Sequence, residues 1–499
     1  MLITLFPIVA MSRVTRSKGT QHEVVSRPSP ITKVPLEIIT EIFKFAILSS
    51  EDARSHGVKA LCLVDKCWNR IANATPDLWT KITLVYPLYA DRLSAIKKWL
   101  EASEPKVIDL EVYYFGYRWS TYPEDNWLPP EKSDAFPDVI TVFTGSERRW
   151  RSISVGSDMG GPTCRSLGPW VSYGPPELES IYFEWLDEFF GLAEDRFISS
   201  RSIPLPITPD INEVLMPKLR EVSICAAGVN WEVATTSFKN LRKLEIRDLP
   251  RGAGPTFEQF SALLAASPRL ETLNLSGYHP ARGNLPIQTR TPHVHLPVLK
   301  SLVFAWTNTD LACDLLTMFQ IPETLETLSL ANINCGLGVP RAGGSTRFVY
   351  LGGSSQIFKF FADFGSGDSK NKDPSIPRIS VAGLKSLSMS WLESDSCDMI
   401  TFLRMAQMVE EIRLTNVSQA VLQSIVDLAK TRSLPSLKRL YLRWICSGEH
   451  VSAEARPAID FLRDLGLQVI VKEFAGEVEG FSPIGLKAKL AKEDAEWAA

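Results

Sequence analysis

A short hydrophobic pattern recurs along most of this 499-residue chain. Written with Φ for an apolar residue and x for any residue, the pattern is Φ-x-x-Φ-x-Φ. Its eleven copies begin at the lead residues Val107, Trp150, Leu178, Leu219, Leu241, Leu270, Leu299, Leu325, Leu384, Val409 and Leu437. Alternating apolar residues of this kind predict a short strand with one buried face.

Two further features distinguish these copies from chance matches. The residue after the lead is charged in ten of the eleven copies, whereas charged residues make up 22% of the chain. The leads from Leu219 to Leu325 are separated by 22, 29, 29 and 26 residues, and those from Leu384 to Leu437 by 25 and 28. Leucine-rich repeats have a period of about 20–29 residues. The spacing therefore predicts an α/β solenoid, with parallel strands on the concave face and helices and loops on the convex face.

The segments between the strands support this interpretation. Apolar residues recur at helical spacing over residues 257–264, 398–408 and 417–430, which predicts helices that return the chain to the next strand. The asparagine that often bonds the turn, eight residues past the lead, is absent. That position instead holds Leu186, Leu249, Tyr278, Ile333, Leu392, Val417 and Ile445. We therefore expect turns closed by apolar packing and an irregular solenoid resembling degenerate leucine-rich repeats.

The solenoid is expected over residues 85–470, with insertions near 115–137 and 335–380. Residues 347–351 are a candidate hidden strand within the second insertion, and residues 365–374, rich in Gly, Ser, Asp and Lys, are expected to form an exposed loop. Residues 471–499 are predicted to be a C-terminal cap or tail. A helix over residues 91–101, with Leu93, Ile96 and Leu100 on one face, should bridge the solenoid to the segment before it.

That earlier segment, residues 32–84, has the spacing of a small helical module and follows a polar tail over residues 1–31 that we expect to be disordered. Pro35 suits the first turn of a helix, where the missing N–H costs nothing. Apolar positions follow at Leu36, Ile38, Ile39, Ile42, Phe43 and Ala46. Together they make a wider face than one small partner helix covers. The excess predicts docking onto the rest of the chain or into a partner.

Three strings of the module resemble the F-box: Val34-Pro-Leu-Glu-Ile-Ile-x-x-Ile-Phe, Leu61-x-Leu-Val-x-x-x-Trp-x-x-Ile-Ala and Thr75-Pro-x-Leu-Trp. The Leu-Trp ending and the strand after it are similar to those of F-box proteins of filamentous and mushroom-forming fungi. Two positions depart from the pattern. Val34 replaces the usual leucine, and Lys66-Cys67 stands where Cys-Arg or Ser-Arg is common.

The resemblance implies a substrate-recognition subunit of a Skp–cullin–F-box ubiquitin ligase, in which the module docks on the Skp adaptor, and through it on a cullin, while the solenoid binds a protein target. The implied adaptor-facing residues are Pro35, Leu36, Ile38, Ile42, Phe43, Leu61, Val64 and Trp68. Some of these residues must also form the module's own core. The alternative is a non-catalytic leucine-rich-repeat scaffold with no ubiquitin-ligase role, whose N-terminal helices only cap the array.

Residues that alternate with the buried positions should face the concave surface. The candidate target-binding residues are Lys243, Glu245, Arg247, Arg413, Arg439, Tyr441 and Arg443, with Trp306, Trp391 and Trp444. Each of these tryptophans, like Trp185, lies seven residues past its lead. They either form a ladder at the rim or, as we favour, pack against the turn of the neighbouring repeat. The arginine-rich end is either an anchor for a target or a solvated face.

Composition narrows the function further. The net charge of −3 favours neither nucleic acid nor a membrane surface, and no apolar run is long enough for a membrane span. The eight cysteines are spread along the chain without a zinc or disulfide spacing. The pair His293 and His295 lacks neighbouring acidic or cysteine ligands. We therefore expect no enzyme activity, no metal and no cofactor, and a cytoplasmic or nuclear location.

Overall fold

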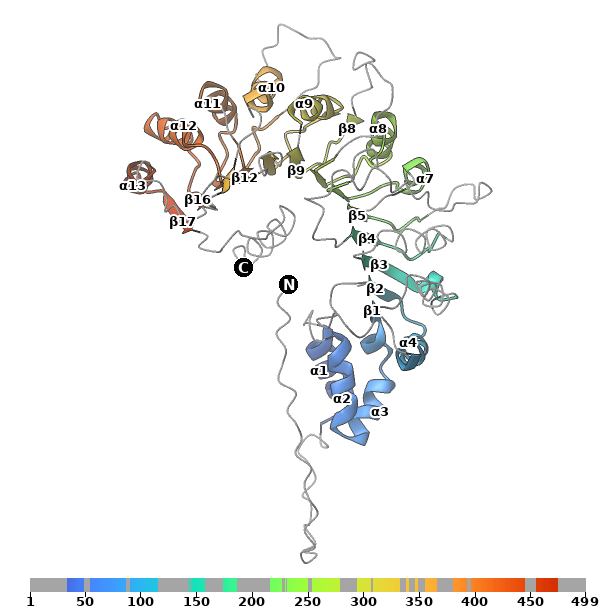
Figure 1. The fold of residues 1–499 in the computed structure, drawn as a ribbon. Helices are drawn as coiled ribbons and strands as arrows, with labels where there is room; N and C mark the ends of the chain where they lie inside the picture. Colours follow the sequence, from blue (N-terminus) through green and yellow to red (C-terminus); the bar gives the residue numbers. More distant parts are fainter. Residues whose placement is uncertain are drawn as a thin grey trace, which may run out of the picture.

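The structure is a computed structural model of the chain. It describes residues 34–48, 54–86, 90–114, 143, 145–157, 174–185, 216–226, 229, 231–249, 254–278, 294–306, 308–332, 338–340, 346–348, 355–365, 380–392, 396–444 and 455–473. The strands line the inside of an arc, the helices cover its outside, and a helical module stands at its N-terminal end (Figure 1). The tail expected over residues 1–31 and the insertion expected at 115–137 lie outside the described residues.

One parallel sheet runs the length of the arc. In spatial order its thirteen strands are β1 (Lys81–Tyr86), β2 (Ile108–Tyr114), β3 (Trp150–Ser157), β4 (Ser180–Trp185), β5 (Glu221–Cys225), β6 (Lys243–Arg247), β7 (Thr272–Ser276), β9 (Ser301–Trp306), β11 (Thr327–Asn332), β14 (Ser386–Ser390), β15 (Glu411–Thr415), β16 (Arg439–Trp444) and β17 (Gln468–Glu473). All eleven copies of the pattern are strands of this sheet. The predicted α/β solenoid is confirmed.

Helices on the convex side bury the outer face of the sheet. They are α7 (Trp231–Ser237), α8 (Phe257–Ala265), α9 (Thr309–Thr317), α10 (Ser355–Gly365), α11 (Ser396–Met405), α12 (Gln419–Lys430) and α13 (Arg456–Asp464). The three predicted return helices correspond to α8, α11 and α12. The α8 helix begins at a capping box, because the Thr256 hydroxyl accepts from the backbone N–H of Gln259 and the Gln259 side chain accepts from that of Thr256.

Two strands of the sheet extend the solenoid beyond its expected limits of 85 and 470. The first strand, β1, has the repeat pattern with Trp79 as its lead, although the sequence assigned it to the module. The register of β1 on β2 aligns Lys81 with Asp109, so the boundary moves to Thr80. The last strand, β17, lacks the pattern because Gly466, with a φ of 85°, occupies the lead position. Of the residues 471–499 expected to form a C-terminal cap or tail, 471–473 belong to β17 and the rest lie outside the described residues.

The hidden repeat expected between Leu325 and Leu384 is wrong. Strand β11 pairs directly with β14. Residues Thr346–Phe348 (β13) form a separate antiparallel pair with Gly338–Pro340 (β12). Residues Ser355–Gly365 of the expected insertion form α10, whose buried aromatic side chains pack against α11. Nearly all of the loop expected at residues 365–374 lies outside the described residues.

The turns after the strands share a left-handed residue, seven positions past the lead. Its φ lies between 50° and 62° at Ala226, Asp248, Gly277, Trp391 and Asn416. At each of these positions the backbone N–H donates to a carbonyl at the end of the next strand, at 2.6–2.9 Å. This backbone ladder replaces the missing asparagine ladder. The residue after each of the last four is apolar and buried, as expected, at Leu249, Tyr278, Leu392 and Val417.

The charged residues that follow the leads form a ladder with alternating signs. From β6 to β16 the order is Arg242, Glu271, Lys300, Glu326, Lys385, Glu410 and Lys438. Three ion pairs join neighbouring repeats, Lys300 to Glu271 at 2.8 Å, Lys385 to Glu326 at 3.1 Å and Lys438 to Glu410 at 2.9 Å. If a strand paired with the next strand but one, two like charges of the ladder would lie side by side. The ladder therefore favours the native order of the strands.

The module consists of α1 (Leu36–Leu48), α2 (Arg54–Val64), α3 (Lys66–Asn73) and a short 3₁₀ turn, η2 (Pro76–Trp79). Its core is a separate cluster made of Ile39, Phe43, Ile47, Val58, Ile71, Ala72, Leu78 and Trp79. The Asp65 carboxylate caps α3 by accepting from the backbone N–H of Trp68 at 2.8 Å. The module therefore has a complete interior of its own.

Candidate protein-interaction surfaces

Large apolar side chains remain exposed on the first two helices of the module. We call them the module patch, and they are Leu36, Ile38, Ile42, Phe45, Leu63 and Val64, with exposed fractions between 52% and 85%. Ile38, Ile42 and Phe45 follow one another at i, i+4 and i+7 and so form a stripe along α1. An exposed apolar stripe of this kind is typical of surfaces that bind another protein.

The structure divides the eight implied adaptor-facing residues into two sets. Pro35, Leu36, Ile38, Ile42 and Val64 are exposed. Phe43 is buried instead, 1% exposed, with its ring centroid 4.8 Å from that of the half-buried Trp68. Leu61 also packs against the module core. Phe43 therefore lies with Ile39 and Ile47 on the buried face of α1, and it packs inside the module beneath the exposed residues.

Two patch residues, Phe45 and Leu63, were not among the residues implied by the sequence. They are the most exposed of the group, at 77% and 85%. The spacing of Phe45 from Ile38 and Ile42 could have placed it on the stripe. Leu63 is a position of the second F-box-like string, but its exposure could not be predicted because it depends on how α2 packs against α1.

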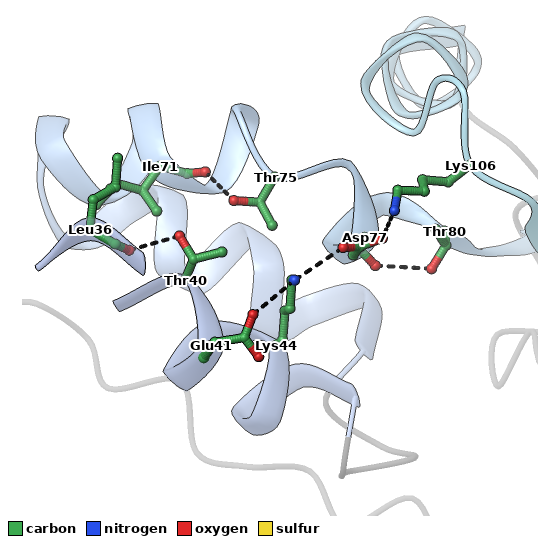
Figure 2. A network of polar contacts seen from close by, with 9 residues as sticks. All are labelled: Leu36, Thr40, Glu41, Lys44, Ile71, Thr75, Asp77, Thr80 and Lys106. Atoms are coloured by element: carbon green, nitrogen blue, oxygen red, sulfur yellow. Dashed lines mark hydrogen bonds and ion pairs between the residues drawn. The ribbon is translucent and has the colours of Figure 1, made fainter. Parts of the chain in front are cut away.

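A charged network joins the module to the first repeats (Figure 2). Lys44 of α1 lies 3.2 Å from the Asp77 carboxylate of η2, and Lys106, just before β2, lies 2.9 Å from the same carboxylate. The hydrogen bond from Lys106, together with that from Lys44, lowers the pKa of Asp77 below its usual value although partial burial opposes the shift. Asp77 therefore links α1 to the solenoid.

A second link is hydrophobic. The predicted bridging helix is α4 (Ala90–Ala102), with Ile96 and Leu100 buried in the core of the solenoid. Trp99 of this helix packs against both that core and the core of the module, 6.2 Å from the ring centroid of Trp79. Trp79 in turn donates its indole N–H to the carbonyl of Ala72 at 2.8 Å. The module is therefore packed onto the array through aromatic contacts.

The concave face carries charges at its two ends and none in its middle. The residues that alternate with buried positions on β7, β9, β11 and β14 are uncharged, and most are Ser, Thr, Ala or Asn. At the C-terminal end, β15 and β16 carry the arginine cluster, which we define as Glu411, Arg413, Arg439, Tyr441 and Arg443.

The arginine cluster is organised by one buried carboxylate. Glu411 accepts from Arg413 Nε at 2.6 Å and lies 3.0 Å from Arg439 Nη2. The Arg413 guanidinium lies 5.2 Å from the ring centroid of Tyr441. Arg443, by contrast, is buried. Arg413 and Arg439 are therefore the cations of this cluster that a ligand could reach.

The predicted binding residues on β6 form a network among themselves. Glu245 lies 3.1 Å from Lys243 and accepts from Ser223 at 2.8 Å, and Arg247 donates to the hydroxyl of Tyr182 at 3.2 Å. Burial would raise the pKa of Glu245, but Ser223 and the two cations together lower it. Burial, with the charge of Glu184, raises the pKa of Tyr182. The buried Nε of Arg247 has no hydrogen-bond partner among the described residues and lies 3.8 Å from Glu245. Tyr182 is a member of the network that the sequence did not suggest.

The tryptophans expected at a rim do not share one environment. Trp306 is buried and packs beside Phe304, at 5.8 Å between ring centroids, so it supports the core and is not a surface anchor. Trp391 is half-buried at a left-handed turn. The side chains of Trp185 and Trp444 lie outside the described residues.

Neither a metal cluster nor a transmembrane element occurs in the described part of the chain. No three His, Cys, Asp or Glu side chains there come together in a way that could hold a metal ion. None of the helices described has the length and apolar character needed to cross a membrane.

Comparisons with known proteins give distant likenesses. One solved structure is the leucine-rich repeat-containing protein LegL7 from Legionella pneumophila, 14% identical with a TM-score of 0.30, covering 82% of this chain and 96% of that chain. Another is the complex of Rad7 and Elc1 in yeast, 13% identical with a TM-score of 0.34, covering 87% and 92%. No protein-family model and no curated protein matches.

The chain's own sheet, register and repeat spacing define its class. It is a leucine-rich-repeat-like solenoid with a small helical module packed on its first strand. The module patch and the concave face are its two candidate interaction surfaces.

Proposed function

We propose that this protein is the substrate-recognition subunit of a Skp–cullin–F-box ubiquitin ligase. The module patch binds the Skp adaptor, through which a cullin is reached, and the solenoid binds a protein target. The chain itself performs no chemistry in this scheme. It places the target near the enzymes of the complex, and proximity of this kind is a large contribution to rate.

The observation that carries the proposal is the exposure of the module patch beside a complete module core. A small helical module buries its apolar residues when it can, since each large side chain left in water forgoes about 1.5–3 kcal/mol. Here Ile38, Ile42 and Phe45 stay exposed while Ile39 and Phe43 on the same helix are buried. The resemblance of the three sequence strings to the F-box supports the identity of the partner that covers them.

The rigid attachment of the module is consistent with this role. Asp77, Trp79 and Trp99 connect the module to the first repeats through ion pairs and ring contacts. A recruiting subunit must hold its target in a fixed direction relative to the adaptor. Attachment on two sides restricts rotation between the parts.

The alternative is a scaffold whose helices only cap the array. A cap shields the first strand with its apolar face, and in this protein that contact is made by Trp79 and Trp99. The module patch takes no part in the contact. A cap alone therefore does not account for the exposed residues of α1.

Calorimetric titration of the full-length chain with purified Skp adaptor tests the proposal. Ile42→Asp places a carboxylate within the expected interface and should weaken binding by more than about tenfold. Met408→Asp is the matched control, because Met408 is also 53% exposed but lies on the solenoid. It should leave the affinity within about twofold.

Two results would overturn the proposal. One is wild-type protein that does not bind the adaptor at all. The other is Ile42→Asp that binds as tightly as Met408→Asp while both variants remain folded by circular dichroism.

A further inference from the structure

We propose that the arginine cluster binds an acidic, extended segment of a partner protein. The inference deepens the proposed function, because this segment would belong to the recruited target. The binding itself does not require the adaptor, since the cluster lies on β15 and β16, at the end of the array away from the module (Figure 1).

The two reachable cations are held in place before any ligand arrives. Glu411, with a side chain only 9% exposed, contacts both Arg413 and Arg439. Their side chains are 30% and 47% exposed. One carboxylate neutralises one of the two charges, so a net positive charge remains. Because the guanidinium groups are already ordered, a ligand that binds them loses little further side-chain entropy.

The chemistry of arginine favours carboxylates. A guanidinium presents five N–H donors in a planar fork that matches a carboxylate, and Glu411 engages only part of each fork. Tyr441 lies against Arg413 and helps to orient it. The cluster can therefore accept two further acidic side chains, one at each arginine.

The part of the concave face next to the cluster, on β7, β9, β11 and β14, determines which residues can follow the acidic part of the ligand. We call this part the floor. From β7 to β14 the inward residues are small and uncharged. These four strands span about 14 Å at about 4.8 Å per step, the length of roughly four extended residues. Beyond them, Glu221 and Glu245 on β5 and β6 are offset by Lys243 and Arg247, both paired with Glu245, so these strands offer an acidic chain no net positive charge. The segment should therefore place its acidic part on β15 and β16 and a short uncharged part along the floor.

A nucleic acid strand fits this face less well. A phosphate backbone needs cations along its whole path, and bases need free aromatic faces on which to stack. The floor has no cation among its described side chains, and one face of Tyr441 is occupied by Arg413.

Fluorescence anisotropy with the full-length chain and a fluorescein-labelled deca-glutamate peptide tests the proposal. Arg439→Glu should weaken binding by about tenfold or more. The matched control is Arg404→Glu, the same change at an exposed position on the convex helix α11, which should stay within about twofold. For wild-type protein, affinity should fall steadily between about 50 and 200 mM salt, a readout that does not depend on how the variants fold.

Three outcomes would refute the proposal. The first is binding of deca-glutamate no tighter than that of a Gly-Ser peptide of equal length. The second is equal weakening by Arg404→Glu and Arg439→Glu, and the third is tighter binding of deca-thymidylate than of deca-glutamate. Ile42→Asp should leave peptide binding unchanged. Wild-type protein that binds the peptide but not the adaptor would therefore reject the proposed function but not this inference.

Discussion

Replacing Trp79 by alanine should uncouple the module from the solenoid. Trp79 is the lead residue of β1 but its side chain lies in the core of the module, 8% exposed. It contacts Trp99 and bonds the carbonyl of Ala72. Loss of a buried tryptophan costs about 3–5 kcal/mol, which includes the cavity that remains. The unpaired carbonyl of Ala72 contributes about 1 kcal/mol of this penalty.

Trp150→Ala is the matched comparison. Trp150 is also a lead residue, is fully buried, and donates its indole N–H to the hydroxyl of Ser146 at 3.0 Å, but it lies within the core of the solenoid alone. Both changes should lower the unfolding temperature. They should differ in which amides become exposed, since local opening follows the packing unit that is weakened.

Hydrogen exchange followed by mass spectrometry measures this difference. Trp79→Ala should speed exchange in α1, α3 and β1 together, whereas Trp150→Ala should speed it in β2, β3 and β4 and leave the module unchanged. Trp79→Phe, which keeps most of the ring volume, should show the same pattern with a smaller amplitude. Faster exchange in α3 without any change in β1 after Trp79→Ala would refute the view that the two parts are packed as one unit.

Three further predictions concern the joints and turns of the array. Asp77→Asn should lower stability at pH 7 by less than about 1 kcal/mol because the side chain is 32% exposed. The pKa of Asp77 in the folded protein is lowered from 3.8, so the difference in stability from wild type should disappear as the pH falls below about 4. Denaturant melts at several pH values measure this difference. Gly277→Ala forces a side chain into a φ of 62° and should lower the free energy of unfolding by about 1–2 kcal/mol. Ala226→Gly at the equivalent turn should lower it by less than about 1 kcal/mol, and equal losses of stability would contradict the role given to the left-handed position. Lys300→Glu places three carboxylates in a row on the charge ladder and should lower the unfolding temperature at low salt but much less at about 0.5 M salt; a loss independent of salt would exclude the electrostatic explanation.

The strands of the solenoid could be predicted because burial on one face imposes a period of two residues. The pattern is local, and it located eleven of the thirteen strands of the sheet, while helical spacing located three return helices. The prediction of strands failed at two positions, one where the lead residue also belongs to the module and one where the lead residue is a glycine. Trp79 is both a lead and a module residue, and the lead of β17 is Gly466, which has no side chain to bury.

Features that depend on pairing between distant segments could not be predicted in the same way. Residues 347–351 are apolar enough for a repeat strand, but residues 346–348 pair with β12 outside the sheet. Trp306 shares its position with Trp391, yet it is buried because Phe304 and α9 leave space for its ring. The division of α1 into a buried and an exposed face likewise depends on how α2, α3 and η2 pack against it.

The most direct test of the account is hydrogen exchange of the full-length protein with and without the Skp adaptor. An interface on the module patch should slow exchange over residues 36–48 and 54–64, and leave β14, β15 and β16 unchanged. Contradiction would come from protection confined to the strands of the solenoid, or from saturating adaptor that alters no amide of α1 or α2.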